Sequence, residues 1–498
     1  MDCCSPSRRK ALIWGGLAAA APLVATAATA TAAAGATQTS SGTLVTDLEV
    51  ATVTDTSVII TWFTGSATET DQYGFPAPVL SDTELQIGLV DPATLTIVPG
   101  SLKTVLQDAT PTAYHYAEVH GLTPGTFYAY VALSGGQQAQ PSSMQFPVGT
   151  GGSLDYPGTF TTLQTPPGRY LFTLALSNDL HMGEGESGII ENGWPPAFEQ
   201  DPGLPPYPVV MLSAMLGDLR QSDRAADRLL VAGDLTSGAA LSDATNVKQL
   251  LDGWGKIEQD YFVTRGNHDR SMTGSSYDSC TPVPNTSPQH YDCWGDVFPY
   301  PLQTLQAYQV GGLRIIGLDT TMLDAAGGTM SAAQLGALED ELRKDRDRPT
   351  LLFGHHPITY ESAATTEAGP AFDIDRPTAI ALQRLYQRTP GVFFHHSGHT
   401  HRNKRTYLLD DTQSPVESVE FLEVGATKEY PGGYSLVRLY TGGYLVSYYK
   451  NRTPDALAWA QRSRHEYYTL YPHYMLGTIA DRNHTVIRDL SGLTPLSS

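Results

Sequence analysis

The chain has 498 residues, of which 41% are hydrophobic and 34 are proline, so it is long enough for two or three domains with separate cores. Its 31 Lys and Arg residues stand against 51 Asp and Glu residues, which gives a formal net charge of −20. Such an acidic chain repels polyanions, so long nucleic acid is excluded as an expected partner, whereas small phosphate-containing molecules are not.

The N-terminal segment, residues 1–36, has the pattern of a twin-arginine-type signal peptide. The sequence Ser7-Arg8-Arg9-Lys10 precedes an apolar, alanine-rich run and a tail of small residues with A-x-A cleavage sites. The alternative is a membrane anchor, but the run is only modestly hydrophobic and its tail is cleavable. We therefore expect an exported protein, extracellular or in the cell envelope, with no stable membrane span after the signal peptide is removed.

Residues 43–165 alternate apolar and polar side chains in short runs separated by Gly, Pro, Asp and Thr, which predicts an all-β domain. A strand is expected at Ser57–Trp62. The later stretch resembles the corner motif of fibronectin type III sandwiches, Leu-x-Pro-x-Thr-x-Tyr, at Leu122, Pro124, Thr126 and Tyr128. The resemblance implies that Tyr128 bonds to nearby backbone, and we interpret both Trp62 and Tyr128 as structural residues.

A Gly, Thr and Pro-rich linker is expected near residues 148–168. From there to residue 450, strand-like and helix-like runs alternate, which predicts a layered α/β domain over 168–450. A helix is expected at Ser331–Lys344, with a serine cap and three leucines on one face. Two runs that begin at Tyr434 and Gly443 predict an antiparallel pair. Residues 451–498 form a C-terminal extension for which the sequence predicts no role.

Four cysteines occur, and two of them precede the apolar run of the signal peptide. The remaining pair, Cys280 and Cys293, predicts one disulfide in an exported protein; two free thiols or a soft metal site are the alternatives. The pair lies in one of two long insertions, residues 182–225 and 271–305. Such insertions either shape access to a site or only cover the sheet.

Five short fragments place metal-ligand residue types directly after strand-like runs. In chain order they are Asp179-Leu-His181, Gly233-Asp234, Gly266-Asn267-His268-Asp269, Gly354-His355-His356 and Gly398-His399-Thr400-His401. Open α/β sheets bind ligands beyond the carboxyl ends of their strands, so the five fragments are expected to meet at one edge.

The ligand types indicate metal-dependent hydrolysis. Two divalent cations about 3.5–4 Å apart can acidify a bridging water and neutralise the charge that develops on a phosphate ester. Asp, Asn and His ligands without thiolate suit manganese, zinc or iron better than calcium or a structural zinc. We therefore expect two divalent metal ions as cofactors, without a prediction of which metal.

The order of the fragments resembles the calcineurin-like metallophosphoesterases over about residues 170–450. The resemblance implies that Asp234 bridges the two metals and that His268 stabilises the phosphoryl group or protonates the leaving oxygen. It implies one metal held by Asp179, His181 and His401, and the other held by Asn267, His355 and His399.

A β-sandwich ahead of such a domain is similar to the layout of plant-type purple acid phosphatases. In that family a tyrosine three residues after the bridging aspartate ligates ferric iron, but Ser237 stands at that position here. The first fragment also supplies His181, as in the non-purple branches. We therefore expect a colourless enzyme with two divalent ions.

Several neighbours of the proposed ligands have two interpretations. His356 either contacts substrate or orients a neighbour. Asp269 either orients His268 or closes a turn with Arg270, and one of His395 and His396 is interpreted as a packed core residue. The glycines that precede the ligands are expected to permit close approach of the backbone.

The predicted fold is thus an all-β fibronectin-III-like sandwich followed by an α/β domain of αββα type. The predicted function is an exported dinuclear-metal phosphoesterase that hydrolyses phosphate mono- or diesters, with a small phosphate ester as substrate and a metal-bridging hydroxide as nucleophile. Two alternatives are a non-catalytic surface binding module with a residual metal site and a metal-dependent nuclease, which the net acidity disfavours. The sequence predicts no oligomeric state.

Overall fold

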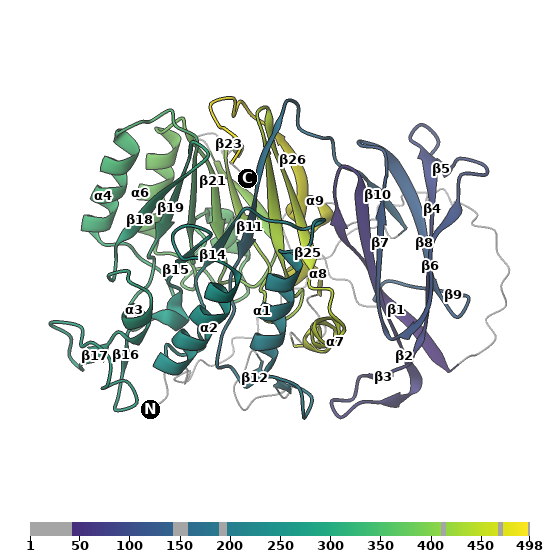
Figure 1. Cartoon of the computed structure of the whole chain (residues 1–498), viewed down its shortest axis with the longest axis horizontal. Helices are drawn as coiled ribbons and strands as arrows, with labels where there is room; N and C mark the ends of the chain where they lie inside the picture. Colours follow the sequence, from purple (N-terminus) through teal and green to yellow (C-terminus); the bar gives the residue numbers. More distant parts are fainter. Residues whose placement is uncertain (1–41, 143–157, 189–196, 410–414, 467–471, 497–498) are drawn as a thin grey trace, which may run out of the picture.

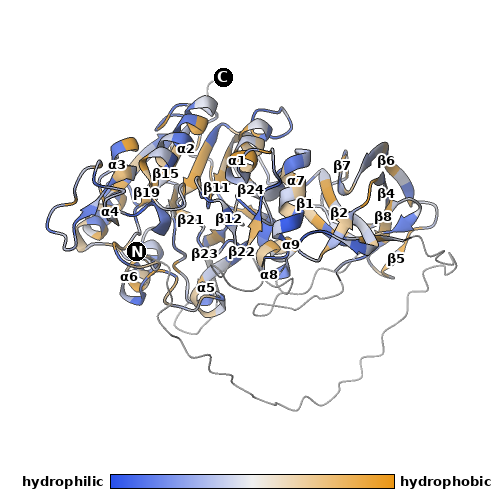
Figure 2. Ribbon diagram, turned by 90° about the horizontal axis from the view of Figure 1, so that it is seen from below, coloured by the Kyte–Doolittle hydropathy of each residue, from blue (hydrophilic) through white to orange (hydrophobic). Residues whose placement is uncertain are grey.

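A computed structural model describes residues 42–142, 158–188, 197–409, 415–466 and 472–496. The predicted signal peptide and part of the predicted linker lie outside these residues. Figures 1 and 2 show a β-sandwich at one end of the molecule beside a larger layered domain, with apolar residues along the strands of both. In the described part of the chain, no helix combines the length and the apolar character that crossing a bilayer requires.

The N-terminal domain consists of two antiparallel sheets. In the first sheet β2 (Ser57–Thr70) pairs with β1 (Thr43–Val53), β3 (Pro76–Pro78) and β7 (Tyr114–His120). The second contains β4 (Ser81–Asp91), β5 (Thr96–Ile97), β6 (Lys103–Thr112), β8 (Phe127–Ser134), β9 (Gln137–Gln138) and β10 (Thr159–Thr161). Apolar side chains from both sheets form one buried cluster, as the alternation of the sequence predicts.

The two aromatic residues that we interpret as structural are both buried in this sandwich. Trp62 donates from its indole nitrogen to Ser134 Oγ at 2.8 Å and stacks on His115. The Tyr128 hydroxyl accepts a hydrogen bond from the backbone N–H of Thr123 at 3.0 Å, which is the backbone contact expected of a tyrosine corner. The all-β sandwich is present, whereas its assignment to the fibronectin type III fold stays a prediction.

The layered domain contains two six-stranded mixed sheets packed face to face. The first, in spatial order, consists of β15 (Tyr261–Thr264), β14 (Arg228–Ala232), β11 (Tyr170–Ser177), β24 (Gly433–Tyr440), β25 (Gly443–Lys450) and β26 (Asn483–Ile487). The second consists of β18 (Leu305–Val310), β19 (Leu313–Leu318), β20 (Thr350–Gly354), β21 (Val392–Ser397), β23 (Pro415–Glu423) and β22 (Lys404–Leu409). Strands β11, β14 and β15 are mutually parallel, and so are β19, β20, β21 and β23.

A buried cluster with side chains from both sheets fills the space between them. Helices α1 (Tyr207–Asp218) and α2 (Leu241–Trp254) cover the outer face of the first sheet, and α4 (Ala332–Arg343) and α6 (Arg376–Gln387) cover that of the second (Figure 1). This is the αββα arrangement that the sequence predicts. Helix α4 confirms the predicted helix, because the Ser331 hydroxyl caps it and Leu338 and Leu342 are buried.

The insertions and the C-terminal extension carry the remaining elements. The first insertion contains β12 (Glu186–Ser187), β13 (Phe198–Glu199) and the whole of α1, so it is not irregular throughout. The second contains β16 (Met272–Thr273), β17 (His290–Tyr291) and α3 (Cys293–Val297), and its predicted Cys280–Cys293 disulfide is confirmed. The other short elements are α5 (Tyr360–Thr365), α7 (Pro454–Ser463), α8 (Pro472–Leu476), α9 (Ile479–Arg482) and the 3-10 turn Asn267–Asp269.

The extension after Lys450 joins the two domains. Its last strand, β26, pairs with β25 at the edge of the first layered sheet. Arg464 binds Asp47 and Glu49 of β1, each at 3.0 Å, and Glu49 also binds Lys450 at 2.5 Å. Burial alone would raise the pKa of Glu49, but Lys450 and Arg464 outweigh it and lower that pKa to about 2. A charged network therefore holds the sandwich against the layered domain.

Candidate metal centre

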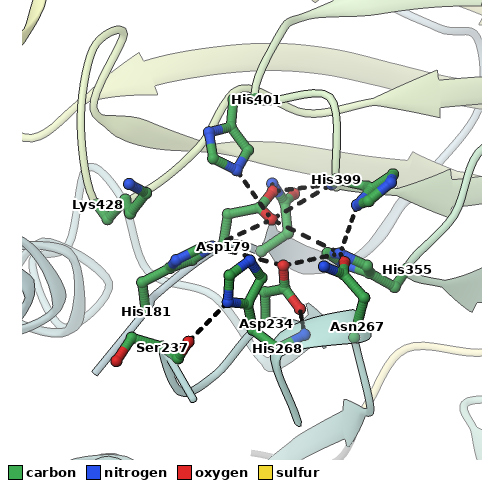
Figure 3. Close-up of polar contacts among 12 residues, drawn as sticks. Asp179, His181, Asp234, Ser237, Asn267, His268, His355, His399, His401 and Lys428 are labelled. Atoms are coloured by element: carbon green, nitrogen blue, oxygen red, sulfur yellow. Dashed lines mark hydrogen bonds and ion pairs between the residues drawn. The ribbon is translucent and has the colours of Figure 1, made fainter. Parts of the chain in front are cut away.

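The carboxyl ends of five parallel strands deliver the predicted ligands to one place. The residues come from both sheets, because β11, β14 and β15 belong to the first and β20 and β21 to the second. Figure 3 shows their side chains pointing toward one another. Brought together are Asp179, His181, Asp234, Asn267, His268, His355, His399 and His401.

Five of these residues have a left-handed backbone conformation, which costs about 1–3 kcal/mol for a residue other than glycine. Their φ angles are 50° at Asp179, 45° at His181, 50° at Asp234, 72° at His399 and 54° at His401. Such strain persists only where the surrounding structure fixes it, and it concentrates at functional sites. The left-handed conformation at these five residues therefore lowers the stability of the folded protein, and it turns their side chains into the site.

Three of the preceding glycines, Gly233, Gly266 and Gly398, allow the strand ends to approach each other. Gly233 has φ +82°, and a Cβ there would lie 2.7 Å from the His355 Cβ. A Cβ at Gly266 would overlap the Asp234 carboxylate. Gly354 has no such crowding, since its nearest neighbour would lie at 3.4 Å. A Cβ at Gly398 would lie 2.6 Å from Asn178 Cβ, so the close approach expected of these glycines is present at Gly233, Gly266 and Gly398.

Gly266→Ala is expected to displace the Asp234 carboxylate and to weaken metal binding and turnover roughly 10-fold to 100-fold, as displacement of residues around a metal site commonly does. Metal content and kcat/KM of the purified variant check this. Gly253→Ala is the matched control, because an added Cβ in α2 would meet nothing within 4 Å. Equal metal content and turnover in both variants would show that the crowding at Gly266 is relieved without moving Asp234.

Asp234 occupies the centre of the site. Its Oδ2 atom lies 3.5 Å from His181 Nε2 and 3.0 Å from His355 Nε2, so one carboxylate oxygen faces both halves of the ligand set. On one side, Asp179 Oδ1 lies 3.5 Å from His401 Nε2. On the other side, His355 Nε2 lies 3.0 Å from Asn267 Oδ1 and 3.1 Å from His399 Nδ1.

The outer ring nitrogen of each proposed histidine ligand faces a polar partner, which directs the other nitrogen into the site. The hydrogen-bond acceptors are Ala232 O for His355 at 2.8 Å, Phe372 O for His399 at 2.7 Å and Glu429 Oε1 for His401 at 2.6 Å, and His181 Nδ1 lies within ion-pair distance of Glu184 Oε2, at 3.1 Å. The inward Nε2 of His181 is buried without a hydrogen-bond partner. These inward atoms fit divalent metal ions of the kind that imidazole and carboxylate bind.

The electrostatics of the cluster favour positive charge. Burial would raise the pKa of Asp234, but His355 and His268 outweigh it and hold that pKa well below its usual range. Burial opposes charge on His401 as well, yet Asp179 and Glu429 raise its pKa well above the usual value. The site thus draws either protons or cations, and metal binding would displace the protons.

His268 lies beside this cluster. Its Nδ1 donates to the backbone carbonyl of Ser237 at 2.6 Å, and its ring lies 4.6 Å from that of His181. Burial lowers its pKa, while the nearby Asp234 opposes that shift. The hydrogen bond to Ser237 engages Nδ1 and restricts the orientation of the ring.

His356 has both ring nitrogens occupied. Nδ1 lies 2.7 Å from Thr320 Oγ1 and Nε2 lies 2.9 Å from Ala326 O, and the side chain is fully buried. A direct contact with substrate would break one of these bonds. Substrate binding by His356 stays a prediction, and this geometry favours the alternative, in which His356 packs beside His399 with ring centroids 4.5 Å apart.

Asp269 closes the turn that holds Asp234. Its carboxylate accepts from the backbone N–H groups of Leu235 at 2.9 Å, Thr236 at 2.8 Å and Gly266 at 3.0 Å. This agrees with the turn-closing interpretation, although the partners are these amides and not Arg270.

His395 and His396 are both fully buried, against Tyr386 and the Ser177 carbonyl respectively. Both are packed core histidines.

Three charged residues that the sequence analysis does not identify lie directly behind the ligands. Glu429 accepts from His401, Glu184 forms an ion-pair contact with His181, and Lys428 bridges these two carboxylates at 2.9 and 2.8 Å. Glu184 follows His181 by three residues, a spacing that could have indicated it. Lys428 and Glu429 lie in the loop between β23 and β24, about 250 residues away, and no motif in the sequence connects them to the site.

Comparison with protein families finds a match over the part of the chain that contains the site. Residues 172–403 match the family model described as calcineurin-like phosphoesterase. The matched region includes all seven proposed metal ligands and His268. Comparison with the curated proteins finds no match.

Solved structures with a similar chain include two phosphatases. The purple acid phosphatase PPD1 from seeds of yellow lupin (Lupinus luteus) is 15% identical, with 81% of this chain and 72% of that chain covered and a TM-score of 0.40. A dimetal phosphatase from Danio rerio is 14% identical, with 56% and 96% covered and a TM-score of 0.39. A structure of PhoD is 11% identical, with 81% and 85% covered and a TM-score of 0.35.

Proposed function

We propose that the protein is an exported phosphoesterase that hydrolyses small phosphate mono- or diesters with two divalent metal ions. One ion would be held by Asp179, His181 and His401, and the other by Asn267, His355 and His399, with Asp234 shared between them. The observation that carries the proposal is the convergence of these seven side chains, with the outer ring nitrogens of the histidines directed to polar partners and the inner nitrogens of His181 and His355 facing the shared carboxylate.

The metals would supply an activated water and neutralise charge on the phosphate oxygens. The residues of the chain would hold the metals and the histidine rings in place. Asp234 lies between the two ligand groups, and the acceptors behind the histidines restrict each ring to one orientation. His268, held through Ser237, presents Nε2 toward the site, where it would donate a hydrogen bond to the phosphoryl group or a proton to the leaving oxygen.

The remaining parts of the proposal come from the sequence. Ser237 stands where a purple acid phosphatase has its iron-binding tyrosine, so we propose a colourless centre of two manganese, zinc or iron(II) ions. The Cys280–Cys293 disulfide supports export, because disulfides persist in oxidising compartments. We also propose the twin-arginine route for that export and a fibronectin type III fold for the sandwich.

Metal removal and reloading test the function. The mature protein, stripped with a chelator, is expected to lose activity and to regain it with manganese, zinc or iron. The measurement is turnover of p-nitrophenyl phosphate and bis-p-nitrophenyl phosphate, and their ratio separates a phosphatase from a phosphodiesterase. Inactivity on both substrates and on a broad ester panel, with both metals bound, would favour a binding module. Faster turnover of long DNA would favour a nuclease.

A further inference from the structure

The two halves of the proposed metal site have different partners behind their histidines. His355 and His399 donate their outer N–H groups to neutral backbone carbonyls, those of Ala232 and Phe372. On the other side, the outer nitrogens of His181 and His401 face carboxylates at 3.1 and 2.6 Å. A carboxylate behind an imidazole makes the inward nitrogen a stronger metal donor than a carbonyl does.

Lys428 joins the two carboxylates behind His181 and His401. Its Nζ atom lies 2.9 Å from Glu184 Oε2 and 2.8 Å from Glu429 Oε2, and the side chain is only 3% exposed. Figure 3 shows Lys428 on the side of His181 and His401, away from His355 and His399. Because a buried ammonium between two carboxylates is tightly constrained, it fixes the orientation of both histidines from behind.

The same network continues away from the site. The Ser187 hydroxyl lies 2.7 Å from Glu429 Oε2 and 3.0 Å from Glu466 Oε2, and Lys428 lies 3.3 Å from that hydroxyl. All four residues are buried. Glu429 is therefore held from two directions, and its second oxygen is left to accept from His401.

The distribution of charge follows the same asymmetry. The first ligand group contains the carboxylate of Asp179, whereas the second has the neutral amide of Asn267 at the comparable place. Glu184 and Glu429 add two negative charges behind the first group, of which Lys428 balances one. Since charges at such short range and low exposure interact strongly, a divalent cation is held more firmly in the first group.

We infer that Glu184, Lys428 and Glu429 position His181 and His401 and make the Asp179–His181–His401 site the tighter of the two metal sites. This inference rests on the proposed function. The three residues act through the histidines and contact neither metal nor substrate, so their effect is on metal affinity.

Stepwise zinc binding to the metal-free protein tests the inference. Competition with a chromophoric chelator and calorimetry measure the two dissociation constants, and His401→Ala and His399→Ala assign each constant to a site. The wild-type protein is expected to bind one zinc more tightly than the other, and His401→Ala is expected to abolish the tighter event. Glu429→Gln is expected to weaken that event roughly 10-fold to 100-fold and to leave the second constant unchanged.

Two further variants separate positioning from general loss of structure. Glu184→Gln, at a side chain that is 20% exposed, is expected to act in the same direction as Glu429→Gln. Glu186→Gln, at an exposed residue of β12 two positions further along the chain, is the matched control and is expected to change neither dissociation constant. The unchanged second constant in each Gln variant shows that the centre is still folded.

Equal affinity at the two wild-type sites would overturn the inference and leave the proposed function standing. If the dissociation constant of the tighter site is unaltered in both Glu184→Gln and Glu429→Gln, the inference is likewise overturned and the proposed function still stands. If the wild-type protein binds no zinc at either site, the dinuclear centre and the proposed function fail together.

Discussion

Asp234→Asn is expected to lower the occupancy of both metal sites and to reduce kcat/KM by about 10³-fold or more. The substitution keeps the shape of the side chain but removes the charge that lies between the two ligand groups, 3.5 Å from His181 and 3.0 Å from His355. Bound metals contribute several kcal/mol to transition-state stabilisation, and each 1.36 kcal/mol corresponds to about tenfold in rate. Metal content after gel filtration and turnover of both p-nitrophenyl substrates are the measurements.

The same substitution at an exposed position serves as the control. Asp340→Asn on α4 removes a carboxylate whose side chain is 75% exposed, and it is expected to leave metal content and turnover unchanged. Circular dichroism of both metal-free variants establishes that they are folded. Two tightly bound metals and wild-type turnover in Asp234→Asn would show that the charge of this carboxylate does not hold the centre together.

The sequence predicts the assembly of the site because the ligands follow parallel strands. A parallel strand places its carboxyl end at the same edge as its neighbours, so an Asp, Asn or His just beyond each strand must come close to the others. This reasoning needs no knowledge of loop conformation. It accounts for Asp234, Asn267 and His355, which directly follow strands β14, β15 and β20 or come within three residues of them.

The partners behind the histidines could not be predicted in the same way. Glu429 reaches His401 only because the loop after β23 returns over the site, and a loop of this kind has no periodicity in its sequence. The positive φ angles at His181 and His401 also depend on tertiary contacts, because only a small fraction of residues other than glycine adopt this conformation, even though histidine is among the types enriched in it.

Helix α1 and strand β26 illustrate two other limits. Helix α1 is buried on most sides, so its apolar residues show no stripe of 3.6-residue period, and the segment around it suggests an irregular insertion. Strand β26 has only five residues, with the polar Asn483 and His484 buried at its start. His484 is paired with Glu420 at 2.7 Å, a contact between distant segments that local sequence patterns do not reveal.

His268→Ala is expected to leave both metals bound and to lower kcat by about 10²-fold to 10⁴-fold, the range typical of a lost general acid or base. Metal content should persist because His268 is not one of the seven proposed ligands, all of which remain in the variant, and its Nδ1 is engaged by the Ser237 carbonyl. Its backbone N–H still donates to Asp234 Oδ1, at 2.8 Å, in the variant. Metal analysis and steady-state kinetics of the same preparation measure both effects.

Substrates with different leaving groups then distinguish the two roles of His268. If Nε2 protonates the leaving oxygen, the loss is much larger for an alkyl phosphate than for p-nitrophenyl phosphate, whose leaving group departs without a proton. If Nε2 instead donates a hydrogen bond to the phosphoryl group, both substrates lose the same factor, and His268→Gln, which keeps an N–H donor, recovers part of it. A variant as fast as the wild type on every ester would remove His268 from the reaction, because a histidine that matters only for packing would leave kcat unchanged while both metals remain in place.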